Sequence, residues 1–171
     1  MSDATRLDAM SPEDAREALT RCCGAARWAR GMLERRPFGG NDALMRAADE
    51  VWASMEEDDL LEAFAHHPRI GADMDELKKR FASTSAWASG EQAAARGASE
   101  ETLRALRDGN LAYEARFGFI FIVCATGKSA EEMLALLRAR LDNERADELR
   151  IAAGEQAKIT RLRLAKLEET R

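Results

Sequence analysis

Proline stands at only three positions of the chain, 12, 37 and 68, and this scarcity of helix breakers constrains the fold more than any other feature. Ala, Leu, Glu, Arg and Met dominate the remaining positions, and these residues favour helix. Helix is therefore predicted over nearly the whole sequence. A length of 171 residues suits one domain that can bury a substantial core. We expect an all-α protein with a single compact multi-helix domain.

Capping residues and prolines indicate where the helices begin and end. Ser11-Pro12-Glu13-Asp14 combines a capping serine, a proline in the first turn and acids at the positive end of the helix dipole. Ser129-x-x-Glu132 has the form of a capping box. The expected helices run from Ser11 to about Cys22, about Ala25 to Arg35, an Asn41 cap to about Met55, Asp58 to His66, Asp73 to Ala82, about Gly90 to Arg96, Ser99 to near Phe117, Ser129 to about Leu141, and about Glu144 to Lys166.

One apolar stretch does not fit the helical pattern. Phe119 to Cys124 has high β propensity, but an isolated strand has no partner in such a chain, so we expect extended or irregular backbone buried among helices. The N–H and C=O groups of a non-helical buried segment need hydrogen-bond partners. A bound heterocycle rich in amide groups could supply them, and core packing alone explains the apolar side chains equally well.

Charge and hydropathy exclude several classes of protein. The formal net charge of −5 leaves no excess of cations to neutralise phosphates, which argues against nucleic-acid binding. The longest apolar run, Phe117 to Ala125, covers less than half of the roughly 20 residues that span a bilayer. Met1-Ser2-Asp3-Ala4 lacks the features of a secretory signal, and the last three residues are not a peroxisomal signal. We expect a cytoplasmic protein without a nucleic-acid or membrane partner.

The only two histidines, His66 and His67, are adjacent, and Pro68 follows them. Neighbouring side chains on a helix point about 100° apart, so one histidine can face a cleft while the other faces outward. Histidine is the side chain best able to transfer protons near neutral pH. By itself the pattern also fits a histidine at a helix C-terminus that interacts with the dipole. The spacing is not that of a helical zinc pair, and no metal site is expected.

Three further groups of residues can carry chemistry. Glu91 and Gln92 place a carboxylate beside a carboxamide, although both are also ordinary residues for the first turn of a surface helix. Arg161 and Arg163 lie on different helix faces, so at most one enters a given site, where a guanidinium can clamp a carboxylate or ureido oxygen. Cys22, Cys23 and Cys124 form a poor disulfide framework and are expected to be reduced.

The order and spacing of these segments resemble one family, the 2-oxo-4-hydroxy-4-carboxy-5-ureidoimidazoline (OHCU) decarboxylases of urate breakdown. The resemblance spans about residues 11–167. The matching stretches are Trp28 through Arg36-Pro37-Phe38, His67-Pro68-x-Ile70-Gly71, Glu91-Gln92, Asn110-x-x-Tyr113-x-x-x-Phe117-Gly118-Phe119, Phe121-Ile122-Val123-Cys124-Ala125-x-Gly127-Lys128-Ser129, and Lys158-Ile159 to Arg163-Leu164.

The resemblance implies an all-α homodimer without metal or organic cofactor that decarboxylates OHCU to (S)-allantoin. It assigns catalysis to His67 and Glu91 as an acid–base pair, of which either can deliver the final proton. The family commonly has serine three residues before the glutamate, whereas this chain has Ala88, followed by Ser89, which takes that role only with a local shift. The implied substrate-binding residues are Pro68, Ala88, Ser89, Gln92, Phe121, Ile122, Val123, Cys124, Ala125 and Arg163.

Two other functions fit the same residues. The pocket could act on a related ureide or hydantoin, because Ala88 departs from the family pattern. The chain could also be a non-catalytic helical module that dimerises through the helix expected over Glu144 to Lys166.

Overall fold

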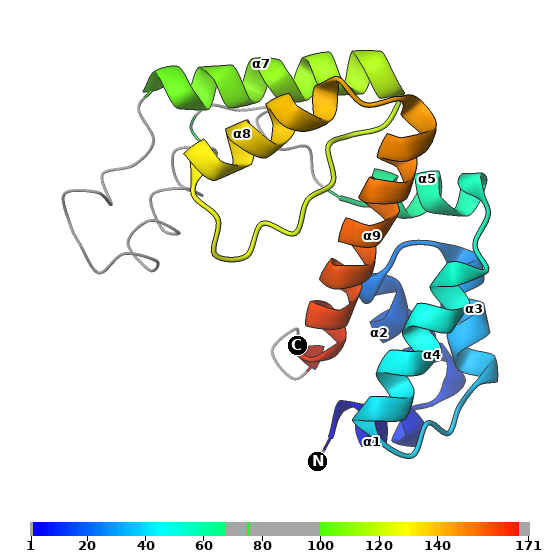
Figure 1. Ribbon diagram of the computed structural model, residues 1–171. Coiled ribbons are helices and arrows are strands. Elements are labelled where there is room, and N and C mark those ends of the chain that lie inside the picture. Colours follow the sequence, from blue (N-terminus) through cyan, green and yellow to red (C-terminus); the bar gives the residue numbers. More distant parts are fainter. Residues whose placement is uncertain (1, 68–74, 76–99, 168–171) are drawn as a thin grey trace, which may run out of the picture. The chain divides into compact units, whose positions relative to one another are not determined.

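The computed structural model describes residues 2–67, 75 and 100–167 (Figure 1). These residues form helices and include no β-strand, which confirms the predicted all-α class. Their contacts group the chain into two compact units, residues 1–67 with 153–171 and residues 68–152. The division falls inside the last helix, between Ala152 and Ala153. The helices expected over Asp73 to Ala82 and Gly90 to Arg96 lie outside the described residues.

The first unit is built from short helices whose starts follow from local sequence. Ser11 Oγ accepts a hydrogen bond from Asp14 N at 3.1 Å and Pro12 is the first helical residue, as predicted. The third predicted start is wrong in detail, because Gly40 holds the cap position and the Asn41 side chain instead accepts from Ala4 N at 3.0 Å. That bond ties the helix that begins at Asn41 to an N-terminal helix that the sequence patterns did not reveal. The helices of this unit are α1 (Asp3–Ala9), α2 (Pro12–Cys22), α3 (Ala26–Glu34), α4 (Asn41–Ala53), α5 (Glu57–Ala65) and the part of α9 (Arg145–Leu164) from Ala153 onward.

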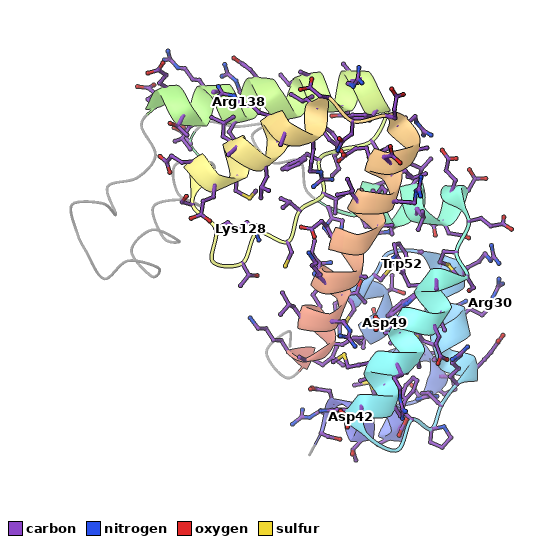
Figure 2. The ribbon with its side chains drawn as sticks, in the orientation of Figure 1. Arg30, Asp42, Asp49, Trp52, Lys128 and Arg138 are labelled. Carbon is purple, nitrogen blue, oxygen red and sulfur yellow. The ribbon has the colours of Figure 1, made fainter. Side chains whose placement is uncertain are left out.

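The core of the first unit centres on Trp28 of α3. Its side chain is fully buried and its indole N–H donates to Ala48 O of α4 at 3.2 Å. A second tryptophan, Trp52 of α4, donates to Ala153 O at 2.9 Å (Figure 2). These two bonds satisfy the polar atoms of large aromatic side chains and fix α4 against both α3 and the last helix.

The second unit contains α7 (Glu100–Phe117), α8 (Ala130–Leu141) and the start of α9 (Arg145–Leu164). Helices α7 and α8 pack side by side (Figure 1). A Cβ on Gly109 of α7 would lie 2.5 Å from Leu137 Cδ2, so the glycine lets α8 approach closely. Ser129 caps α8 by accepting from Glu132 N at 3.1 Å, which confirms the predicted cap.

The segment between α7 and α8 has no regular secondary structure, which confirms the expectation for Phe119 to Cys124. Gly118 allows the chain to leave α7, because its φ of +82° is in the left-handed region that favours glycine. The phenyl rings of Phe119 and Phe121 are buried against Tyr113 of α7. The aromatic cluster therefore holds in place a backbone segment that forms neither a helix nor a β-sheet.

No helix among the residues that the structure describes is long and apolar enough to cross a membrane.

Candidate functional site

His67 follows directly after α5, where the sequence predicted a histidine at a helix end. The Glu56 side chain accepts from the backbone of Asp59, whose carboxylate in turn accepts from Glu56 N, so a capping box starts the helix. His66 is the C-cap residue, and His67 N donates to Phe64 O at 3.1 Å. The end of the helix therefore fixes the backbone of His67 through its own hydrogen bonds.

The two adjacent histidines differ in environment, as the helical geometry predicted. His66 is exposed and its Nδ1 lies 2.9 Å from Glu62 O, one turn earlier in the same helix. A Cβ on Gly24 would lie 2.3 Å from His66 Cγ, so the glycine leaves room for this ring. His67 is half-buried, and its Nε2 lies 2.5 Å from Gln156 Oε1 on α9.

Gln156 and Thr160 are functional candidates that sequence reasoning missed. Both are buried, and Gln156 Nε2 donates to Thr160 Oγ1 at 3.0 Å. Their spacing continues a buried i, i+4 stripe from Ala152 to Leu164. That stripe was the available signal, but a glutamine in an Ala-rich helix resembles a surface residue.

Arg163 is the arginine of its pair that acts on His67. It is half-buried, and its guanidinium lowers the pKa values of His67 and of Cys22 and Cys23. Arg161 points elsewhere and forms an exposed ion pair with Asp49 of α4 at 3.0 Å (Figure 2). That at most one of the two arginines enters a substrate site stays a prediction.

Burial is the main reason that the pKa of His67 lies below its ordinary value. The hydrogen bond to Gln156 opposes this shift, whereas the positive charges of Arg163 and His66 add to it. His67 is therefore a neutral imidazole at neutral pH. A neutral ring can accept a proton from a bound substrate.

The cysteines of this unit are buried and reduced, as expected. Burial raises the pKa of Cys22 to about 12 and that of Cys23 to about 11, so neither is a reactive thiolate at neutral pH.

In the second unit, cationic side chains hold the backbone of the predicted substrate-lining segment. Arg140 of α8 donates to Ile122 O at 2.7 Å, and Lys128 Nζ donates to Cys124 O at 2.8 Å (Figure 2 labels Lys128). The side chains of Phe121, Ile122 and Val123 are buried, whereas Cys124 and Ala125 are half-buried. Side chains of the protein therefore bind two of the backbone carbonyls of this segment. The sequence had left open whether a bound ligand supplies such partners or the segment is only packed in the core.

Arg140 is itself held by a buried network that the sequence did not indicate. Its Nε donates to Glu148 Oε1 at 2.5 Å, and the Tyr113 hydroxyl donates to the same oxygen at 2.5 Å. Asn143 Nδ2 donates to the other carboxylate oxygen at 3.0 Å. The guanidinium also lies 4.6 Å from the centre of the Phe121 ring. Burial and the bond to Glu148 raise the pKa of Tyr113 above its ordinary value.

The structure places His67 and Arg163 in the first unit and Phe121 to Ala125 in the second. The predicted catalytic residue Glu91 and the predicted binding residues Pro68, Ala88, Ser89 and Gln92 lie outside the described residues. Within the described part of the chain, no group of three His, Cys, Asp or Glu side chains could hold a metal ion.

A model of the OHCU decarboxylase family matches residues 8–165. The chain belongs to the OHCU decarboxylase family. The match covers almost the entire sequence and contains every residue that the sequence comparison assigned to the site, including those outside the described residues.

Three relatives illustrate the range of the family. The uric acid degradation bifunctional protein TTL of Arabidopsis thaliana is 40% identical over 147 residues, which are 85% of this chain but 45% of that protein. The OHCU decarboxylase of Haloferax volcanii is 28% identical over 76% of this chain and 74% of its own. A solved structure of an OHCU decarboxylase in the presence of (S)-allantoin is 34% identical, with a TM-score of 0.73, and the match covers 94% of this chain and 99% of that chain.

Proposed function

We propose that this protein removes CO2 from OHCU and forms (S)-allantoin in urate breakdown, without a metal or organic cofactor. The observation that carries the proposal is His67, which is neutral, half-buried and fixed at a helix end in the position of the family's catalytic histidine. The family match over residues 8–165 and the relatives named for uric acid degradation support the same reaction.

The substrate explains why side chains suffice for the chemistry. Its carboxylate is attached to a ring carbon that also carries a hydroxyl and neighbours a C=N bond. When the C–COO⁻ bond breaks, its electron pair moves into the C=N system and CO2 leaves. A proton must then reach the neighbouring carbon, the former carbon of the C=N bond, from one face, while the hydroxyl loses its proton and becomes the ring carbonyl, to give a single enantiomer.

His67 and Glu91 act as the acid–base pair around the hydroxyl-bearing carbon. The neutral imidazole of His67 can orient the hydroxyl and accept its proton, and the pair stabilises the charge that develops as CO2 leaves. Either member can deliver the final proton. Arg163 and Gln92 bind the polar ureide and ring groups, while Pro68 and Phe121 to Ala125 line the substrate.

The decisive experiment generates OHCU from urate with the upstream enzymes and adds this protein. We expect faster formation of allantoin and a single handedness by circular dichroism, whereas OHCU alone decays to a racemic product. Racemic product at the uncatalysed rate would refute the proposal. We further propose that the protein is cytoplasmic and forms a homodimer. Light scattering coupled to size-exclusion chromatography tests the homodimer directly.

A related ureide or hydantoin is the second candidate substrate, because Ala88 stands where the family commonly has serine. This candidate predicts a higher kcat/KM for such a compound than for OHCU in side-by-side assays. A non-catalytic dimerisation module predicts no shift of the melting temperature with allantoin, whereas a decarboxylase is stabilised by its product.

A further inference from the structure

Gln156 is a fully buried amide in direct contact with His67. Its Oε1 lies 2.5 Å from His67 Nε2, and its Nε2 donates to Thr160 Oγ1 at 3.0 Å. Thr160, which is 4% exposed, hydrogen-bonds in turn to the side chain of Cys23. All four residues belong to the first unit. The chain of bonds thus links the catalytic histidine to three buried side chains.

The donor and acceptor atoms of these side chains fix the direction of each hydrogen bond from His67 to Cys23. An amide oxygen only accepts, so His67 Nε2 must carry the proton that it shares with Gln156. The amide nitrogen only donates, so Thr160 Oγ1 accepts and its own hydroxyl proton is available to Cys23 Sγ. The bond from Thr160 lowers the pKa of Cys23, as donation to the sulfur requires. Each member therefore supports the orientation of the next.

We propose that Gln156 is a positioning residue that keeps the proton of neutral His67 on Nε2, so that Nδ1 is the atom that exchanges a proton with substrate. The catalytic part of this inference rests on the proposed function. The tautomer itself rests only on the contacts between His67, Gln156 and Thr160.

His66 provides an internal comparison, because its contacts select the opposite tautomer. Its Nδ1 lies 2.9 Å from Glu62 O, and a carbonyl oxygen can only accept, so the proton of neutral His66 is on Nδ1. The chain has no other histidine. Two adjacent residues therefore carry their protons on different ring nitrogens.

Among the residues that the structure describes, the charged and titratable groups that shift the pKa of His67 are Arg163 of α9 and His66, the C-cap residue of α5. Both disfavour a second proton on the ring. Gln156, being uncharged, selects the tautomer without forcing the ring into its cationic form, which a carboxylate in the same place would do.

Nitrogen-15 NMR of the histidine-labelled protein tests the tautomer directly. At about pH 8, above the ordinary histidine pKa of about 6.5, we expect His67 to show an unprotonated Nδ1 and His66 an unprotonated Nε2. An unprotonated Nε2 on His67 would overturn the inference. If wild-type protein shows the expected tautomers but fails to convert OHCU, the proposed function falls and the tautomer stands.

Paired variants test whether Gln156 positions His67 for the reaction. Gln156→Met has similar length but no acceptor, and we expect kcat to fall by about tenfold to a hundredfold, the range seen when the partner that orients a metal-ligating histidine is lost. KM should change much less, and the NMR signals of His67 should report both tautomers. Unchanged kcat and an unchanged tautomer would contradict the role.

Gln156→Glu retains an acceptor and adds a charge. We expect the same tautomer, with the acid limb of kcat/KM displaced to higher pH by about one unit or more. Lys158→Met, on the exposed face of the same helix, is the control and should match wild type. Circular dichroism shows whether Gln156→Met folds. If it does not, the NMR spectrum of wild-type protein and the pH profile of Gln156→Glu still test the inference. An acid limb of kcat/KM that Gln156→Glu does not displace would count against contact between residue 156 and His67.

Discussion

At the scale of single residues, His67 shows how neighbours define a functional group. From local sequence alone it is a histidine at a helix end, and its position in the family pattern predicts a catalytic role. The structure adds the reasons that it can serve as a base. It is half-buried, it touches Gln156, and the positive charge of Arg163 lowers its pKa.

Replacing His67 tests its role most simply. We expect His67→Asn to lose most turnover of OHCU, because asparagine cannot transfer a proton near neutral pH. The side chain is at the end of α5 and not in the main core, so helix content by circular dichroism should match wild type. Near-normal turnover by the folded variant would remove His67 from the mechanism.

The pKa of His67 gives a pH-dependent prediction with a definite sign. Because the proposed mechanism uses the neutral ring, kcat/KM should fall as pH drops through a pKa below the ordinary value of about 6.5. Arg163→Gln removes a positive charge that lowers this pKa, so the NMR titration of His67 should move to higher pH. A titration that does not move would contradict the electrostatic contact between the two residues.

At the scale of elements, the irregular segment between α7 and α8 depends on charged groups from the neighbouring helices. Arg140 of α8 binds the Ile122 carbonyl and is neutralised by Glu148 of α9. The Glu148 side chain is fully buried, so loss of either charge leaves the other uncompensated in a medium that solvates it poorly.

Neighbouring carboxylates on α9 offer a matched comparison. We expect Glu148→Gln to lower the free energy of unfolding by about 3–5 kcal/mol, as for removal of one partner from a buried pair. Asp147→Asn breaks an exposed pair with Arg150 and should cost less than about 1 kcal/mol. Urea denaturation measures both values, and equal losses would show that the burial of Glu148 contributes nothing.

Two helical glycines should respond oppositely to the same substitution. Gly154→Ala should stabilise the protein by about 0.5–1 kcal/mol, because no described atom lies within 4 Å of the new Cβ. Gly109→Ala should destabilise it, because the new methyl would lie 2.5 Å from Leu137 Cδ2 in the buried contact of α7 and α8. Melting temperatures that shift in the same direction would contradict this packing.

At the scale of the whole molecule, the two compact units share one helix. The division between Ala152 and Ala153 falls within α9. The single domain expected from chain length remains our prediction.

Calorimetry tests this prediction. We expect one thermal transition whose calorimetric enthalpy equals the van't Hoff enthalpy, the behaviour of a two-state domain. Glu148→Gln, which changes the second unit, should then lower the midpoint of the entire transition. Two separate transitions, with only one displaced by the variant, would show independent domains.

Local signals determined most of the helices. Ser11 with Pro12, Ser129 with Glu132, and the stop before Pro37 act within one helical turn, so they can be read from adjacent residues. The end of α5 at the histidine pair and the irregular course of Phe119 to Cys124 also follow from nearby residues. The order of motifs was enough to indicate the family and the candidate catalytic histidine.

Only the tertiary structure decided which polar residues those elements bring together. Gln156 lies 89 positions from His67, and Glu148 lies 35 positions from Tyr113, so no helical period or capping rule connects them. Asn41 shows the same limit, since its side chain binds α1 and not its own helix. Hydrogen bonds between distant side chains depend on how helices pack, and packing is a property of the folded chain.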